Sequence, residues 1–374
     1  MKFAHISDLH LGKRVNGFSM IEDQRHILGE VIKALARNEI EALLIAGDIY
    51  DKTQPSAEAV ALFDDFLCGV NTLGLKTFIV SGNHDSAQRI AFGANLFLKS
   101  DVYVSPVFDG KVMKIPVKDE YGCMNIYLLP YIRPSSVRAA YGVEVYDFEA
   151  ALREVVLRID LDKRQRNLIV AHQFITGAKL SDSEEMNVGG MENISAEVFQ
   201  NFDYVALGHI HGAQDIVKGK IRYCGTPLKY SFSEATHKKS ITVIDMRQKG
   251  EIPKIEQIPL NPLRDLREIK GTYQTIISNA KDTGKNDYVH VILTDEREIP
   301  DAGRKLMLYY PNIMKLSYDN SRTRRRRIIS PCDDKKTEKE LFNDFYKSVT
   351  NSELNGKQQK YIERIFDELK GGLE

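Results

Sequence analysis

Ser81-Gly82-Asn83-His84-Asp85 is the stretch from which the rest of the chain can be interpreted, because it directly follows a short apolar run at residues 76–80. Such a run is typical of a strand, and Asn83 and His84 can bind a metal or carry a proton where that strand ends. Taken alone, the stretch could be an ordinary turn, since Gly, Asn and Asp all suit turn geometry. The other motifs of the chain decide between these interpretations.

Four further strand-like runs end in residues that can bind a metal. These residues are Asp8, His10, Asp48, His172, His209 and His211. In α/β sheets, ligands collect beyond the carboxyl ends of the strands, so all five strand ends could meet in one crevice. An isolated Asp-x-His or His-x-His pair is more often a turn former or a helix cap. Five such ends in one chain favour a shared metal site over coincidence.

The number of donors predicts how many metal ions the site would hold. With His84 kept apart, Asn83 and the six residues above offer carboxylate, amide and imidazole donors. They exceed the three or four protein ligands of a single catalytic zinc, so two ions that share one carboxylate fit better. A ligand set without thiolate favours Mn²⁺ or Fe²⁺, although it does not exclude Zn²⁺. Two ions about 3.5 to 4 Å apart suit in-line displacement at phosphorus, which predicts a phosphate ester as the substrate.

The composition is that of a globular protein with more than one domain. The chain has 374 residues, of which 43% are hydrophobic and 28% are charged. None of its apolar runs approaches the roughly 18 residues of a membrane span. The N-terminal residues lack the apolar core of a signal peptide, so we expect a cytoplasmic protein that does not bind membranes. The four cysteines are widely spaced and form no Cys-x-x-Cys pair, which argues against a thiolate zinc site.

Strand-like and helix-like runs alternate along residues 1–261, which predicts an α/β core. Six runs have the length and apolar character of buried strands: residues 2–7, 42–46, 77–80, 125–129, 167–171 and 204–207. Two stretches, residues 20–38 and 57–73, repeat apolar residues at helical spacing. After Gly212 the runs are shorter and are separated by Gly and Pro, so this half is expected to be more antiparallel.

A domain boundary is expected near Asn261-Pro262-Leu263, where the pattern changes. Residues 263–330 contain enough strand and helix for a small α/β domain, and residues 264–330 carry 14 Lys or Arg against 9 Asp or Glu. This basic segment ends in an arginine run, made of Arg322, Arg324, Arg325, Arg326 and Arg327. Such a run permits contact with DNA phosphates, but it is more often solvated surface.

Residues 331–374 show two helical patterns, joined by residues 351–357, which together predict a helical hairpin. In both patterns, apolar residues recur at i, i+1, i+4, i+5 and i+8, beginning at Leu341 and at Tyr361. A hairpin of about 40 residues cannot bury much surface by itself. Its aromatic face must therefore pack on the main body or on another protein.

Five motifs carry a family resemblance: Asp8-Leu9-His10, Gly47-Asp48, Gly82-Asn83-His84-Asp85, His172 and Gly208-His209-Ile210-His211. Together they resemble the calcineurin-like metallophosphoesterase superfamily, and their flanking residues are similar to the SbcD nucleases within it. The resemblance implies an α/β fold with a four-layer α-β-β-α sandwich over residues 1–262. It also implies a capping domain that contacts DNA over residues 263–330 and a C-terminal helical hairpin over residues 331–374.

The resemblance implies a role for each site residue. One metal would be held by Asp8, His10, Asp48 and His211, and the other by Asp48, Asn83, His172 and His209, with Asp48 as the bridge. His84 would contact the scissile phosphate and protonate the leaving oxygen as a general acid. Asp85 would either orient His84 or cap the helix expected from Ser86, and Asp51 would be a turn residue or would support the site without binding metal.

The resemblance further implies a nuclease that degrades double-stranded DNA ends and cuts single strands and hairpins in DNA repair and recombination. It would act with two Mn²⁺ ions per chain, in an ATP-dependent complex with an SbcC-type ATPase, as a homodimer within a heterotetramer. The C-terminal helices would bind SbcC through Phe342, Phe345, Tyr346, Tyr361, Ile365 and Phe366. Two alternatives stay open: a phosphoesterase for small phosphoesters or phosphoproteins, and a non-catalytic DNA-tethering scaffold.

Overall fold

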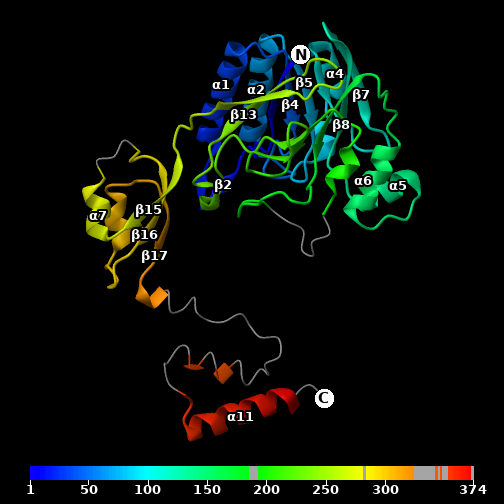
Figure 1. The fold of residues 1–374 in the computed structure, drawn as a ribbon. Helices are drawn as coiled ribbons and strands as arrows, with labels where there is room; N and C mark the ends of the chain where they lie inside the picture. Colours follow the sequence, from blue (N-terminus) through cyan, green and yellow to red (C-terminus); the bar gives the residue numbers. More distant parts are fainter. Residues whose placement is uncertain (185–192, 281–283, 324–341, 344–345, 348–352, 372–374) are drawn as a thin grey trace. The chain divides into compact units, whose positions relative to one another are not determined.

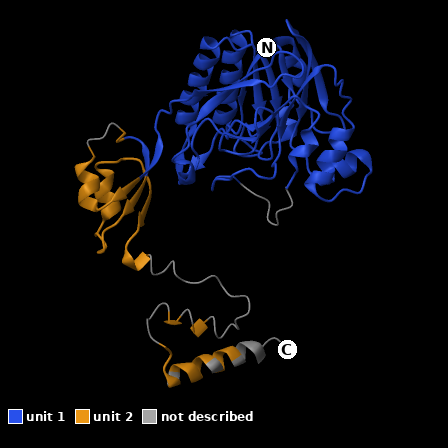
Figure 2. Cartoon of the chain, in the orientation of Figure 1, with its two compact units in different colours: residues 1–268, 286–289 blue, residues 269–285, 290–374 orange. Residues whose placement is uncertain are grey.

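The computed structural model describes residues 1–184, 193–280, 284–323, 342–343, 346–347 and 353–371. The chain divides into two compact units (Figure 2): the first unit comprises residues 1–268 and 286–289, and the second unit comprises residues 269–285 and 290–374. Residues 263–268, which the sequence places in the capping domain, belong to the first unit. Ion pairs of Arg264 with Glu22 and Asp23 hold this segment to the first long helix.

Two six-stranded sheets form the centre of the first unit (Figure 1). The first sheet contains, in spatial order, β14 (Lys254–Pro259), β13 (Ser240–Asp245), β1 (Lys2–Ile6), β4 (Ala42–Ala46), β5 (Lys76–Val80) and β6 (Val102–Val104). The strands β1, β4, β5 and β6 are parallel, while β13 pairs antiparallel with both β1 and β14. The carboxyl ends of the parallel strands therefore lie at one edge of this sheet.

The second sheet contains, in spatial order, β11 (Gln214–Val217), β12 (Ile221–Tyr223), β10 (Tyr204–Gly208), β9 (Arg166–His172), β8 (Gly122–Leu129) and β7 (Met113–Asp119). Its four central strands are parallel, and its edge strands β11 and β7 are antiparallel to their neighbours. The antiparallel pairing expected after Gly212 is confirmed for β11, β13 and β14. It is wrong for the pairing of β12 with β10, which is parallel.

The two sheets share one hydrophobic core, because successive side chains of a strand point to opposite faces. Along β9, Leu168 and Val170 enter the core between the sheets, whereas Ile169 and Ala171 belong to a second core. Phe78 of the first sheet enters the core between the sheets from the other side. Strands buried on both faces appear in the sequence as continuous apolar runs, which is why these strands could be predicted.

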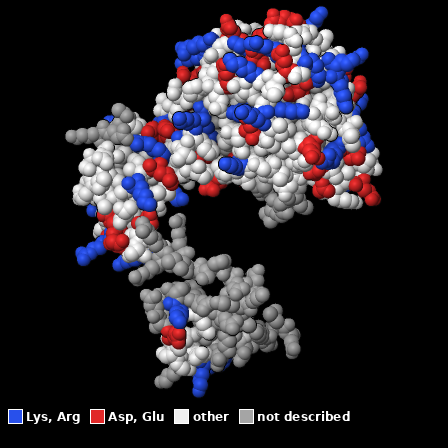
Figure 3. Space-filling model, in the orientation of Figure 1, with Lys and Arg blue, Asp and Glu red and all other residues white. Residues whose placement is uncertain are grey.

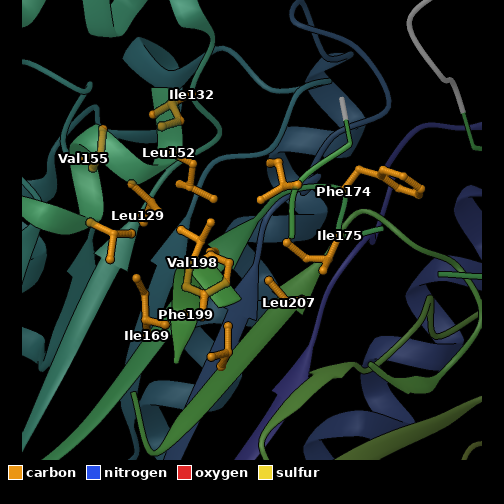
Figure 4. Packing of buried hydrophobic residues seen from close by; sticks show 14 of the residues in the cluster. Leu129, Ile132, Leu152, Val155, Ile169, Phe174, Ile175, Val198, Phe199 and Leu207 are labelled. Atoms are coloured by element: carbon orange, nitrogen blue, oxygen red, sulfur yellow. The ribbon is translucent and has the colours of Figure 1, made fainter. Parts of the chain in front are cut away.

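Helices cover the outer faces of the sheets and complete the predicted α-β-β-α layers. The helices α1 (Ile21–Arg37) and α2 (Ala57–Thr72) were both expected and lie beside the first sheet (Figure 1). The second sheet is covered by α5 (Pro134–Tyr141), α6 (Phe148–Leu157) and the 3₁₀ helix η2 (Ala196–Phe199). Leu152 of α6 and Phe199 of η2 pack against Ile169 and Leu207 of the sheet (Figure 4).

The second unit contains the small α/β fold expected after the boundary. A three-stranded sheet, most of whose residues belong to this unit, has the order β15 (Leu266–Gly271), β16 (Tyr288–Leu293) and β17 (Ile313–Tyr318). The helix α7 (Tyr273–Ser278) follows β15, and the helix α8 (Ala302–Met307) follows β16. Strand and helix thus alternate through this unit.

The second helix of the expected C-terminal hairpin is α11 (Gly356–Gly371), whereas most of the first lies outside the described residues. The rings of Phe342 and Phe366 have centroids 6.1 Å apart, and Gln358 Nε2 donates a hydrogen bond to the Tyr346 hydroxyl at 3.0 Å. Residues from both parts of the hairpin therefore contact each other. Outside the described residues lie Phe345, Arg324, Arg325, Arg326 and Arg327, whereas Arg322 is described and exposed.

Short elements complete the fold: β2 (Arg14–Val15), β3 (Phe18–Ser19), α3 (Ala87–Ile90), α4 (Ala94–Phe97), η1 (Leu98–Ser100) and η3 (Phe232–Glu234). Among the helices of the described ranges, none combines the length and the apolar character needed to cross a bilayer.

Candidate metal centre

The predicted site residues lie at the carboxyl ends of five parallel strands, three from the first sheet and two from the second. Asp8 follows β1, Asp48 follows β4 and Asn83 follows β5. His172 is the last residue of β9, and His209 follows β10. Because the two sheets pack against each other, the ends of these strands meet at one place, as the sequence led us to expect.

The backbone adopts unusual conformations at several of these residues. Asp8, His10, Asp48 and His209 have positive φ angles of 52°, 44°, 50° and 102°. Such conformations are uncommon for residues other than glycine and cost of order 1–3 kcal/mol each, so they persist only where the surroundings enforce them. Here the His10 N–H donates to the Asp48 carbonyl at 3.0 Å, which ties the loops after β1 and β4 together. Four of the eight non-glycine residues with a positive φ in the described chain are therefore candidate metal ligands.

Two glycines allow the strand ends to approach each other. A Cβ atom on Gly82 would lie 2.1 Å from Asp48 Oδ1, and one on Gly208 would lie 1.8 Å from the Ala46 carbonyl oxygen. No side chain fits at either position without movement of the backbone. These close contacts explain the glycines of the Gly82-Asn83 and Gly208-His209 motifs.

One group of potential ligands consists of Asp8, His10 and His211, whose donor atoms all lie within 4.8 Å of one another. The Nε2 atoms of His10 and His211 are 3.2 Å apart. Asp48 is close to the same group, since its Oδ2 lies 3.9 Å from His10 Nε2. These side chains are almost fully buried.

A second group lies on the other side of Asp48. Its Oδ2 is 3.3 Å from His172 Nε2, and Asn83 Oδ1 lies 3.0 Å from that nitrogen and 3.1 Å from His209 Nδ1. A carbonyl can only accept, so the 2.8 Å contact between His172 Nδ1 and the Ala46 carbonyl makes Nδ1 the donor. The lone pair of His172 is therefore on Nε2, which faces the other donors of this group. Metal-binding histidines usually have such a hydrogen-bond acceptor at their second ring nitrogen.

The donor atoms fit divalent metal ions. They are imidazole nitrogens, carboxylate oxygens and one amide oxygen, and Asp48 belongs to two of the groups whose atoms lie within 4.8 Å. Lone pairs that converge in a buried space repel each other unless a cation lies between them. The structure therefore brings together all seven predicted ligands around a shared carboxylate.

Burial and neighbouring charges set the protonation of these groups. Burial raises the pKa of Asp8 to about 6, against the opposing effect of His172 and His211. Burial alone would also raise the pKa of Asp48, but the neighbouring imidazole of His172 outweighs it and the pKa is lowered. Burial lowers the pKa of His209 to about 3 and the pKa of His10 well below its usual value, so both rings are neutral and able to bind metal.

His84 is only partly buried, whereas the aspartate and other histidine side chains of the site are buried. Its side chain is 14% exposed, against 3% for that of Asp48. The ring donates from Nδ1 to the Asp51 carbonyl at 3.2 Å, and its Nε2 lies 4.0 Å from Asp48 Oδ2. His84 also forms a potential ligand group with His10 and Asp48, so the geometry allows either a proton donor or a metal ligand.

Asp85 and Asp51 hold the loops behind the site. The Asp85 carboxylate accepts hydrogen bonds from the backbone N–H groups of Ile49, Tyr50 and Gly82 at 2.9 to 3.1 Å. It thus joins the loops after β4 and β5, and α3 begins without a side-chain cap. The Asp51 carboxylate pairs with Lys13 at 2.8 Å and lies 3.8 Å from His10 Nδ1.

Several residues behind the site were not identified from the sequence. Gln24 of α1 donates to the His10 carbonyl at 2.7 Å and accepts from the Gly12 N–H at 2.9 Å, which holds the loop after β1. Tyr230 donates its hydroxyl to the Leu9 carbonyl in the same loop. Gln24 could have been noticed as a polar residue on the buried face of an amphipathic helix, but Tyr230 lies far away in the sequence and carries no such signal.

Comparison with known proteins relates both parts of the chain to described families. Residues 1–213 match the calcineurin-like phosphoesterase family, and residues 262–350 match the SbcD C-terminal family, described as type 5 capsule protein repressor C-terminal domain. The D subunit of nuclease SbcCD from Staphylococcus epidermidis is 32% identical over 98% of each chain. Among solved structures, a dimetal phosphatase from Danio rerio has a TM-score of 0.44 at 11% identity, with 70% of this chain and 96% of that chain covered. A Thermus thermophilus protein has a TM-score of 0.41 at 15% identity, with 69% of this chain and 98% of that chain covered.

Proposed function

The chain belongs to the calcineurin-like phosphoesterase family and is a homologue of the D subunit of nuclease SbcCD, and on that premise we propose that it is the nuclease subunit of an SbcCD-type complex. It would hydrolyse phosphodiester bonds of DNA, at duplex ends and in single strands or hairpins, in repair and recombination. The observation that carries the proposal is the convergence of six buried aspartate and histidine side chains and the partly buried Asn83 on one site, with Asp48 between the two groups and His84 on the solvent side.

Two divalent ions, most simply Mn²⁺, fit the two ligand groups. One would be held by Asp8, His10, Asp48 and His211, and the other by Asp48, Asn83, His172 and His209. When bound, such a pair supplies an activated nucleophile and neutralises charge on the phosphoryl oxygens. The chain's own contribution is a rigid frame. The Ala46 carbonyl accepts from the His172 ring, Gln24 donates to the His10 carbonyl, and Asp85 accepts from the backbone N–H of Ile49, which fixes the elements that carry the donors.

His84 would act as the general acid. Because its Nδ1 is bound to the Asp51 carbonyl, the ring is fixed with Nε2 toward Asp48. A phosphodiester at the site would place its leaving oxygen within reach of Nε2, which would give up its proton to that oxygen. Its partial exposure also allows the ring to be reprotonated from solvent.

The C-terminal hairpin supports an SbcC-type ATPase as the partner. Its described residues line an apolar groove of about 370 Å³, formed among others by Phe342, Tyr346 and Tyr361. Tyr361 is 57% exposed, and an exposed aromatic surface is typical of interface anchors. Ile365 and Phe366 follow it on α11. Phe345 would complete this anchor set.

A homodimer within a heterotetramer would need a further apolar surface, and the segment after the His84 loop offers one. Phe92 is 82% exposed and Leu96 is 70% exposed, with Phe97 and Leu98 also exposed beside them. Exposed large apolar side chains in one short segment are typical of a contact surface. We propose that residues 92–98 form the contact between two copies of this chain in a cytoplasmic complex.

DNA contacts outside the metal centre are assigned to the arginine run, of which Arg322 is described. Figure 3 shows positive and negative side chains interspersed on the visible face of the first unit, so that face has no single basic surface. The run from Arg322 to Arg327 concentrates positive charge and would bind phosphates in a salt-dependent way.

The proposal is tested by cleavage of blunt duplex and hairpin DNA with Mn²⁺, with and without an SbcC partner and ATP. The expected result is metal-dependent DNA cleavage that exceeds turnover of small nitrophenyl phosphates. Faster turnover of the small esters with no DNA cleavage would favour the phosphoesterase alternative. DNA binding and partner assembly without cleavage under any condition would favour the non-catalytic scaffold.

A further inference from the structure

The candidate ligand His211 is held by hydrogen bonds at its backbone N–H, its carbonyl and its ring. Its N–H donates to Glu184 Oε1 at 2.8 Å, and its carbonyl accepts from Lys239 Nζ at 2.9 Å. Its ring Nδ1 lies 2.7 Å from the Ser183 hydroxyl. Ser183 and Glu184 come from a loop after β9, so residues from a separate part of the chain reach the metal centre.

The hydroxyl of Ser183 lies between the ring of His211 and the carboxylate of Glu234. Ser183 Oγ is 2.5 Å from Glu234 Oε1, while the direct distance from His211 Nδ1 to that oxygen is 3.5 Å. Glu234 is fully buried and forms an ion pair with Lys239, so it is held as a carboxylate. A carboxylate only accepts hydrogen bonds, and a hydroxyl has one proton to donate. Ser183 must therefore donate to Glu234.

The direction of the remaining hydrogen bond follows from this. Since the Ser183 proton is used on Glu234, its oxygen accepts from His211, and the His211 proton is on Nδ1. The lone pair of the His211 ring is then on Nε2, the nitrogen that lies 3.2 Å from His10 Nε2. These two hydrogen bonds, from His211 Nδ1 to Ser183 and from Ser183 to Glu234, form a relay. The relay leaves Nε2 of His211 free to face the other donors.

We propose that Ser183 and Glu234 are positioning residues that fix the tautomer and orientation of His211 and so raise the affinity of the metal site formed with Asp8 and His10. This inference rests on the proposed function for the presence of the metal, but not for the substrate. The side-chain relay at His211 differs from the arrangement at His172, whose ring is held by the backbone carbonyl of Ala46. Side chains that support metal-binding histidines commonly change metal affinity 10- to 100-fold when they are removed.

The structure offers a matched set of variants. Ser183→Ala removes the hydroxyl relay, whereas Ser183→Thr keeps a hydroxyl at the same place. Ser233→Ala is the control for loop docking, because Ser233 Oγ accepts from the Asp182 N–H of the same loop at 2.8 Å but does not touch His211. Glu234→Gln is the second relay variant, since an amide can donate as well as accept.

The test is a titration of the metal-free full-length protein with Mn²⁺ by calorimetry, together with visible spectra of Co²⁺ bound in its place. We expect Ser183→Ala to weaken one of the two sites roughly 10- to 100-fold and to leave the other unchanged. Ser183→Thr should restore the affinity, and Ser233→Ala should match the wild type. Circular dichroism and thermal unfolding identify variants that fail to fold. If Glu234→Gln fails to fold, Ser183→Ala still tests the relay.

Wild-type affinity at both sites in folded Ser183→Ala would overturn the relay and leave the proposed function standing. The relay would equally be rejected if both sites weakened alike or if Ser183→Thr behaved as Ser183→Ala does. A wild-type protein that binds no divalent metal would instead overturn the proposed metal centre itself, and the relay with it. The two failures are therefore distinguished by the wild-type titration.

Discussion

Replacing His84 by alanine should remove a proton donor while the metal ligands stay in place. The side chain interacts with the Asp51 carbonyl at 3.2 Å and approaches Asp48 Oδ2 only to 4.0 Å. The backbone N–H of residue 84, which donates to Asp48 Oδ1 at 2.9 Å, is retained in the variant. We therefore expect His84→Ala to bind as many Mn²⁺ ions per chain as the wild type.

The size of the effect should depend on the leaving group. Loss of a general acid commonly lowers the rate about 10²- to 10⁴-fold, which corresponds to about 2.7 to 5.5 kcal/mol in the activation free energy. A DNA alkoxide needs this proton in order to leave, whereas nitrophenolate leaves without it. His84→Ala should therefore lose most of its activity on DNA and little of its activity on a nucleoside nitrophenyl phosphodiester.

The assay is single-turnover cleavage of both substrates at saturating Mn²⁺, with the bound metal measured in the same samples. His26→Ala is the matched control, because His26 is a partly exposed histidine of α1 whose Nε2 contacts the Asn261 carbonyl and which belongs to none of the ligand groups. Equal losses on both substrates, or a loss of bound metal, would refute the acid role. A loss of bound metal would assign His84 to the ligand group that it forms with His10 and Asp48.

Three further predictions concern stability. Gly208→Ala, whose Cβ would lie 1.8 Å from a carbonyl oxygen, should lower the free energy of unfolding in urea by about 3 kcal/mol, whereas Gly29→Ala, with open space around it, should not lower it. Arg264→Ala leaves a buried aspartate unpaired and should cost about 3 kcal/mol, against less than about 1 kcal/mol for the exposed Arg247→Ala. Burial lowers the pKa of His5 from 6.5 to about 3, so the unfolded state gains a proton first as the pH falls. The metal-free protein should lose about 1.4 kcal/mol of stability at about pH 5.5, and His5→Gln should remove that part of the pH dependence.

The sequence predicts the site because its candidate ligands follow strands that are buried on both faces. Such strands appear as uninterrupted apolar runs, so β4 and β9 could be located and the polar residues after them noticed. By contrast, β7 is an edge strand whose residues alternate between buried and exposed, and its charged residues hide it. The helices α5 and α6 are short, and their apolar faces alone do not distinguish them from loops.

The supporting residues could not be predicted because their partners are remote in the chain. Tyr230 contacts a loop 221 residues away, and Ser183 contacts His211 across 28 residues. Neither contact follows a helical or strand period. The positive φ angles of Asp8 and Asp48 are equally invisible in the sequence, because aspartate rarely adopts them unless neighbouring loops impose them.

The most direct test of the two-metal nuclease is cleavage of hairpin and blunt duplex DNA by metal-stripped protein as Mn²⁺ is added. The account predicts no cleavage without metal, activity that rises to a plateau at two ions per chain, and loss of both tight metal binding and cleavage in Asp48→Asn, because Asp48 lies between the two ligand groups. Cleavage that persists without divalent metal, or that is complete with one ion per chain, would contradict it.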